Sequence, residues 1–247
     1  MEITIIPTQK EFKKFLEHFP PILSNSKLPD WYKTIPRGND LDFYLNTFHD
    51  TGPLTAKACP AIQDTLTAGI IIPLWSKLAF RTTRDDEGNI KEQRWDLLAR
   101  NATGHNLEIF LDQHAPEQLK GLELKKNVNN TVLKLQLPYY IKVPDGYNIF
   151  YTDPFYHFRQ DIKCLPGIVE GDKWGTVAFP FEILKDNFII EPGTPLVQAY
   201  IFKREKEKID LNVRDATPEE QEDMDNKQFH LRNTGQNYRT NKNPNIL

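Results

Sequence analysis

From residue 67 to residue 204 the chain alternates short apolar segments with turn-forming residues, and this rhythm restricts the fold more than any other feature of the sequence. The segments have the length of β-strands and are short for independent helices. The run Asp85-Asp86-Glu87-Gly88-Asn89 has the composition of a hairpin turn. We therefore predict a sandwich or barrel-like β domain. Its strands are expected at residues 69–74, 78–83, 92–98, 107–111, 131–137, 139–143, 147–152, 176–181, 188–190 and 197–202.

The residues before this region follow a different pattern. Residues 2–6 predict a short strand, and Phe12 and Phe15 have helical spacing within residues 9–18. Thr8 followed by Glu11 is a capping-box pattern, so we predict that the helix begins at this pair. Residues 22–66 are rich in proline, glycine and aromatic side chains. We therefore assign residues 1–66 to a helix and an irregular arm that packs on the β domain.

The chain after residue 204 changes character again. Thr217 precedes a proline and two acidic residues, which is the pattern of a helix start. We predict a helix over 218–233 that Gly235 closes. The polar tail 236–247 is expected to be either frayed or ordered against another subunit. Residues 205–247 thus form a linker, a helix and a tail.

Composition and charge restrict the function classes. The net charge is −3, from 31 basic and 34 acidic residues, and without a long basic run we expect no nucleic-acid site. Cys59 and Cys164 lie far apart in sequence, which favours free thiols over a disulfide. The six histidines lack metal-ligand spacing, so we expect no metal site. Because no segment has the pattern of a signal peptide or a membrane span, we expect a cytoplasmic protein.

Four segments, read in order, resemble the motifs of the dUTPase and dCTP deaminase-like (β-clip) superfamily. They are Thr67–Ile72, Val143–Tyr147, Gly167–Gly175 and Ile190–Gln198. The resemblance implies a mainly β fold, a β-clip or distorted jelly-roll of dUTPase type over residues 67–204, with an insertion at about 80–135. The segments Leu-Pro-Gly-Ile-Val at 165–169 and Phe-Pro-Phe at 179–181 are also similar to uncharacterised proteins of tailed phages.

The same resemblance implies a set of candidate site residues. Glu170 and Asp172 match the carboxylates of the third motif and are the candidate catalytic residues. By themselves, glycines at this spacing permit either close approach of a ligand or only tight turns. The candidate ligand-binding residues are Gly167, Gly171, Lys173, Trp174, Gln198 and Tyr147.

Several positions depart from the family pattern. Ile71 stands where the family has an aspartate that helps to hold magnesium triphosphate, and Asp153 lies in the segment where the family has Arg-Ser on a phosphate. Glu170 replaces the aspartate that activates water, and its stem is one methylene longer. Pro195 stands at the arginine position of the fourth motif. These changes remove groups that bind phosphate and metal.

Two functions therefore remain open. The first is a non-catalytic β-clip protein of phage type with a structural, assembly or ligand-binding role. The second is a nucleotide pyrophosphatase, acting on dUTP-like substrates, with a rearranged active site. We expect no cofactor in the first case and magnesium in the second. Expected partners are other copies of the chain, as a trimer, and a nucleotide or a phage or host protein; for a phage protein the location would be the host cytoplasm or the virion.

Overall fold

The computed structural model describes residues 1–36, 55–97, 110–122, 124, 131–205 and 209–234. The chain divides into two compact units. The first unit comprises Met1–Thr34 and Thr65–Arg204, and the second comprises Ile35–Asp64 and Glu205–Leu247. The first 34 residues therefore belong with the β domain, whereas the sequence analysis grouped them with residues 35–66.

The first unit is mainly β, and the strand pairs of its described residues are antiparallel. Its largest sheet has five strands in the order β11-β9-β14-β3-β2. Sequence-distant segments are thus neighbours, because β14 pairs with both β3 and β9. The strands are β2 (Ile22–Leu23), β3 (Ile70–Pro73), β9 (Tyr147–Thr152), β11 (Gly167–Glu170) and β14 (Pro195–Lys203).

A four-stranded sheet packs against one face of this sheet. Its order is β10-β12-β7-β6, from Ile162–Cys164, Ala178–Ile183, Val132–Gln136 and Leu111–Gln113. Tyr151 on β9 meets Phe179 on β12 with ring centroids 5.0 Å apart. Alternate residues of both sheets fill one buried cluster, as expected for sheet-on-sheet packing. Much of the core thus lies between these two sheets, and residues of the smaller sheets and of the N-terminal helical segment extend it.

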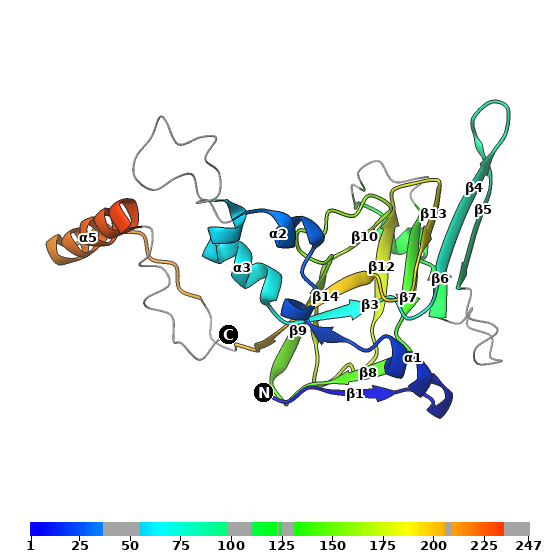
Figure 1. Cartoon of the computed structure of the whole chain (residues 1–247), viewed down its shortest axis with the longest axis horizontal. Helices are drawn as coiled ribbons and strands as arrows, with labels where there is room; N and C mark the ends of the chain where they lie inside the picture. Colours follow the sequence, from blue (N-terminus) through cyan, green and yellow to red (C-terminus); the bar gives the residue numbers. More distant parts are fainter. Residues whose placement is uncertain (37–54, 98–109, 123, 125–130, 206–208, 235–247) are drawn as a thin grey trace. The chain divides into compact units, whose positions relative to one another are not determined.

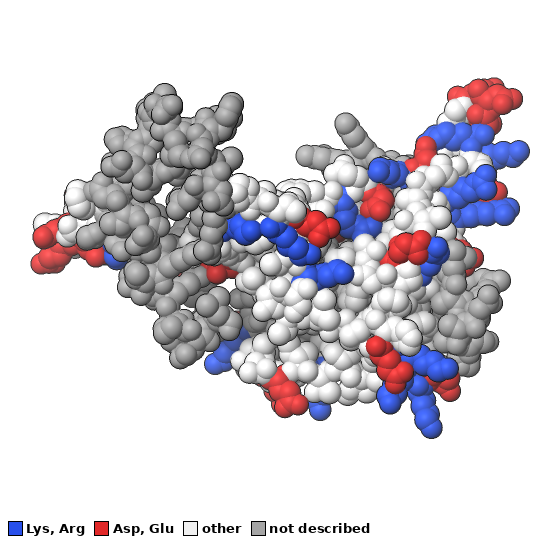
Figure 2. All heavy atoms as spheres, viewed as in Figure 1, with Lys and Arg blue, Asp and Glu red and all other residues white. Residues whose placement is uncertain are grey.

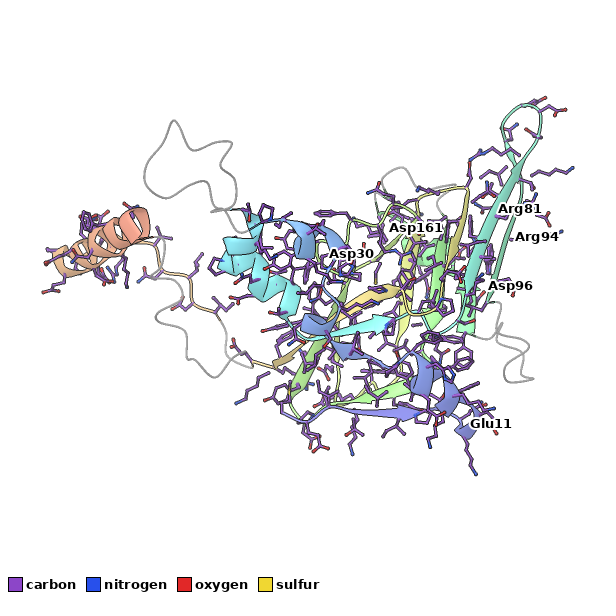
Figure 3. The ribbon with its side chains drawn as sticks, viewed as in Figure 1. Glu11, Asp30, Arg81, Arg94, Asp96 and Asp161 are labelled. Atoms are coloured by element: carbon purple, nitrogen blue, oxygen red, sulfur yellow. The ribbon has the colours of Figure 1, made fainter. Side chains whose placement is uncertain are left out.

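Two smaller sheets complete the described part of the first unit (Figure 1). The hairpin of β4 (Leu78–Arg84) and β5 (Ile90–Leu97) pairs through β4 with β13 (Asn187–Ile190). Arg81 and Arg94 lie opposite each other on this hairpin (Figure 3). Figure 2 shows acidic side chains at the hairpin's tip and basic ones along it. The second small sheet pairs β1 (Thr4–Pro7) with β8 (Tyr139–Lys142).

Most of the short helical segments lie between β1 and β3 in the chain. The predicted helix over 9–18 is a 3₁₀ turn, η1 (Lys10–Phe12), followed by α1 (Lys13–His18). The capping box predicted for it is wrong, because the Thr8 hydroxyl donates to the carbonyl of Pro138, 3.0 Å away, and ties β1 to β8. The further segments are η2 (Ser24–Ser26), α2 (Asp30–Thr34), η5 (Ala56–Ala58), α3 (Pro60–Thr67) and η7 (Pro116–Leu119).

The second unit contains the predicted C-terminal helix as α5 (Pro218–Thr234). Thr217 caps it as predicted: its hydroxyl accepts from the Glu220 amide, and the Glu220 carboxylate accepts from the Thr217 amide at 2.8 Å. Gly235 and the tail 236–247 lie outside the described residues. Among the helices that the structure describes, none combines the length and apolar character needed to cross a membrane.

Candidate functional site

The candidate catalytic carboxylates lie at one corner of the five-stranded sheet. Glu170 ends β11, Asp172 lies in the turn that follows, and Arg204 comes directly after β14. These segments meet because β11 and β14 flank β9 on its two sides. The turn at Gly146, which precedes β9, completes the corner. We call Glu170, Asp172, Lys173 and Arg204 the carboxylate corner.

Asp172 is bound on both of its carboxylate oxygens. Its Oδ2 accepts from the Gly146 amide at 2.8 Å, and its Oδ1 accepts from Nη2 of Arg204. Gly146 has φ +80°, which a side chain would strain, and the sequence prediction of a glycine turn here is confirmed. Asp172 therefore fastens this turn to the end of β14.

Arg204 connects three further segments of the corner. Its Nε donates to Oδ1 of Asn148 at 2.8 Å, and its amide donates to the Gly146 carbonyl at 2.7 Å. Its Nη1 lies 3.6 Å from the Glu170 carboxylate, which also forms an ion pair with Lys173. Sequence analysis missed Arg204, because it lies in the mixed-charge run 203–208, which has the composition of a solvated linker. The sequence feature that could have indicated Arg204 is its spacing of six residues from Gln198, because an even spacing along an extended strand places two side chains on the same face.

The electrostatics of the corner are balanced. The hydrogen bond from Lys173 holds the pKa of Glu170 below its usual value, with Arg204 adding to the effect. The hydrogen bond from the Gly146 amide lowers the pKa of Asp172, and Arg204 lowers it further. Two carboxylates therefore face two cations. Each carboxylate is paired with a lysine or arginine of the corner. A triphosphate or a magnesium ion would have to compete with these ion pairs.

These lowered pKa values predict acid sensitivity. Both carboxylates bind protons less readily in the folded chain than in the unfolded one, so their stabilisation is present above the ordinary pKa values of about 4 and is lost as pH falls below them. We expect Asp172→Asn to lower the free energy of unfolding at pH 7 and to reduce its loss between pH 5 and pH 3. Urea titrations at these pH values measure both effects, and 0.5 M salt should shrink the pH 7 difference. Parallel pH profiles for the two proteins would contradict the prediction.

Of the remaining candidate residues of the third motif, Gly171 packs against core side chains, whereas Gly167 and Trp174 do not. The Gly171 amide donates to the Tyr147 carbonyl at 3.1 Å, and a Cβ on Gly171 would lie 2.7 Å from the Ile149 side chain. A Cβ on Gly167 would have no atom within 4 Å. Trp174 is 65% exposed. Close packing of core side chains thus explains Gly171 without a ligand.

Gln198 lies apart from the corner. It is six residues before Arg204 on β14, roughly 20 Å along an extended strand. It is 1% exposed, and its amide group donates to the carbonyls of Thr65 and Ala68 and accepts from the Phe155 amide. The structure therefore brings together Glu170, Asp172 and Lys173, and does not bring Gln198 to them.

Two positions that depart from the family pattern are also structural. Ile71 is a buried neighbour of Gln198 across the β3–β14 pair. Asp153 accepts from the Cys164 amide at 2.7 Å, and burial raises its pKa. Asp153 thus joins the loop after β9 to β10, in the segment where the resembled family binds phosphate.

No protein-family model matches the chain, and no curated protein matches it. Within the described ranges, no group of three or more histidine, cysteine, aspartate or glutamate side chains could hold a metal ion.

Proposed function

We propose that the chain is a non-catalytic, dUTPase-like β-clip protein of phage type with a structural and assembly role. The observation that carries this proposal is the bonding of Asp172, whose two oxygens are held by Gly146 and Arg204. A carboxylate occupied in this way stabilises a turn. The burial of Gln198 against backbone groups supports the same interpretation.

Nucleotide pyrophosphatase activity is the second candidate function. It is favoured by the convergence of Glu170 and Asp172 with Lys173 and Arg204, since paired carboxylates next to cations can bind metal and phosphate. It is disfavoured by Ile71, which is buried in the sheet and has no group that can bind metal. In this alternative the cofactor is magnesium.

A pyrophosphate-release assay separates the two functions. We expect no turnover of dUTP or other nucleoside triphosphates with magnesium, because electrostatic positioning of the phosphates supplies most of such catalysis. A thermal-shift panel of nucleotides should likewise leave the melting temperature unchanged, since only ligands that bind the folded state raise it. Turnover at ordinary enzymatic rates that Glu170→Gln abolishes would establish the pyrophosphatase instead.

A further inference from the structure

The sheet of β13, β4 and β5 has one face in the core and one face open to solvent. On the core face the rings of Phe80 and Phe188 stack with centroids 5.3 Å apart, and Phe80 is 2% exposed. The residues next to them in each strand point to the other face, because side chains alternate along a strand. On that open face Asn187 of β13 is opposite Arg81 of β4.

A groove of about 490 Å³ lies on this open face, between β4 and β13. Its size is within the range of pockets that hold ligands, roughly 300–1,000 Å³. Ile189, which is 60% exposed and opposite the small side chain of Ala79, supplies an apolar wall. The residues that line the groove are Ala79, Phe80, Arg81, Asn187, Phe188 and Ile189.

Arg81 is the charged residue of this lining, and in the part of the chain that the structure describes it forms no ion pair. Two other arginines of the hairpin are paired, Arg84 with Asp186 at 2.8 Å and Arg94 with Glu92 at 2.7 Å. Arg94 is opposite Arg81 (Figure 3), and like charges in this position repel each other. An anionic group in the groove would bind the unpaired guanidinium and offset this repulsion.

The groove lies next to an outer edge of the sheet. Among the described strands β13 pairs with β4 alone. The Thr82 amide donates to the Asp186 carbonyl at 2.8 Å, so these opposite residues form a hydrogen-bonded pair. Hydrogen-bonded and non-hydrogen-bonded pairs alternate along an antiparallel ladder. The amides and carbonyls of Asn187 and Ile189 therefore point away from β4, toward the edge.

The two edges of this sheet differ in their protection against further pairing. β5, the other outer strand, carries Lys91, Glu92, Arg94 and Asp96, and charges on an edge strand discourage pairing with another chain. β13 has the sequence Asn-Phe-Ile-Ile, with neither a charge nor a proline. An edge strand of this kind is a template for the addition of a further strand.

We propose that an extended acidic peptide of a partner protein adds to the sheet beside β13 and places a carboxylate on Arg81. The main chain of Asn187 and Ile189 holds the peptide, and the groove selects its side chains. An antiparallel peptide has an apolar residue opposite Ile189 and, two residues later, an acidic residue opposite Asn187. The acidic side chain and Arg81 meet over Asn187, across two strand spacings of about 10 Å in total.

An acidic partner protein fits these features better than other occupants. β13 contains no acidic residue, so β13 of a second copy would bring no carboxylate to Arg81. Single-stranded nucleic acid needs a row of cations along its backbone, and the groove offers one. The site goes beyond the proposed function and shares no residue with the carboxylate corner. It therefore does not depend on whether that corner is catalytic.

Peptide titrations of the full chain test the contact. The probes are acetyl-Thr-Xaa-Thr-Glu-Thr-amide, with valine, leucine or phenylalanine at Xaa, and the same three peptides with glutamine in place of glutamate. We expect the glutamate peptides to shift the amide NMR signals of Asn187 and Ile189 saturably. The glutamine peptides should bind with a Kd at least threefold higher at low salt. No shift with any glutamate peptide at millimolar concentration, or equal binding of both sets, would overturn the proposal.

A matched pair of substitutions tests the cation. Arg94→Gln is the control for Arg81→Gln, because Arg94 is on the same face of the same hairpin but outside the groove. Arg81→Gln should raise the Kd of the glutamate peptides at least threefold and that of the glutamine peptides less than twofold. Arg94→Gln should change either Kd less than twofold. Equal effects of the two variants would overturn the role of Arg81.

N-methylation of the peptide tests strand addition without changing the protein. In the antiparallel register the glutamate amide points toward β13, and the amide of the central threonine points away. A methyl group on the glutamate amide should raise the Kd at least tenfold, and one on the threonine amide less than twofold. Equal effects, or the reverse order, would overturn strand addition. Without peptide, hydrogen exchange at Asn187 and Ile189 that slows as the chain concentration rises would show a second copy at the edge and would also overturn the proposal.

Discussion

Replacing Gly69 with alanine is expected to lower the free energy of unfolding by about 2–5 kcal/mol. Gly69 has φ +70°, and this left-handed conformation alone costs a residue with a side chain about 1–2 kcal/mol. A Cβ would also lie 2.0 Å from the Ala199 carbonyl oxygen. That oxygen belongs to the backbone of β14, so relief requires β3 and β14 to separate. Overpacking of this kind commonly adds 1–3 kcal/mol.

Alanine substitutions at two other glycines distinguish the cost of the positive φ from the cost of the steric clash. Gly88 has φ +85° and a Cβ on it would have no atom within 4 Å, so Gly88→Ala should cost only about 1–2 kcal/mol. Gly167 has open space without a positive φ, and Gly167→Ala should stay within about 0.5 kcal/mol of wild type. Urea unfolding of the three variants measures the order. A Gly69→Ala protein as stable as Gly88→Ala would show that the strands adjust to the added methyl group.

The strands that could be predicted from the sequence are those with a strong local pattern. The apolar run near Ile70–Pro73, the alternation of Tyr147–Thr152 and the turn at Asp85–Asn89 depend on neighbouring residues alone, and the structure confirms them. The helix after Thr217 was predictable for the same reason, since its cap is a short-range signal. Local chemistry thus sufficed for much of the β-rich fold and for the C-terminal helix.

The elements that were missed depend on distant partners. β10 and β11 are three and four residues long, and β11 contains a glycine, so neither has a clear strand pattern. They form because β12 and β9 supply their hydrogen-bonding partners. Helix α3, at Pro60–Thr67, was hidden in a proline-rich stretch that looked irregular. Thr8 was misassigned because its true acceptor, Pro138, is 130 residues away.

In the candidate site, too, the features set by neighbouring residues could be predicted and those set by distant residues could not. The third motif placed Glu170 and Asp172 close together, because they are two residues apart. It could not show that Arg204 binds Asp172, since that contact needs β11 and β14 to flank the same strand. Nor could it show that Gln198 faces the backbone of residues 65–68. The resemblance of residue types therefore located the carboxylate corner. Only the structure shows that the hydrogen-bonding partners of these side chains belong to the fold.

Gln198→Leu is expected to destabilise the fold by about 3 kcal/mol. The substitution preserves most of the side-chain volume but leaves the Phe155 amide without its acceptor, 3.0 Å away in the native chain. A buried amide in that state costs about 1–3 kcal/mol. The carbonyls of Thr65 and Ala68 each lose a donor as well, at about 0.5–1.5 kcal/mol per hydrogen bond. For a chain of this size the melting temperature should fall by roughly 6–12 °C.

The matched control is Gln136→Leu, because Gln136 is an exposed glutamine at the end of β7. This substitution should change the free energy of unfolding by less than about 0.5 kcal/mol.

Gln198→Glu adds a pH test. Its buried carboxylate would have a raised pKa, so the variant should lose stability as pH rises from 5 to 8, opposite in sign to the acid sensitivity of Asp172. If Gln198 bound a ligand and did not stabilise the fold, the ligand-free chain would tolerate Gln198→Leu and Gln198→Glu. Melting curves of both variants that match wild type would therefore contradict the prediction.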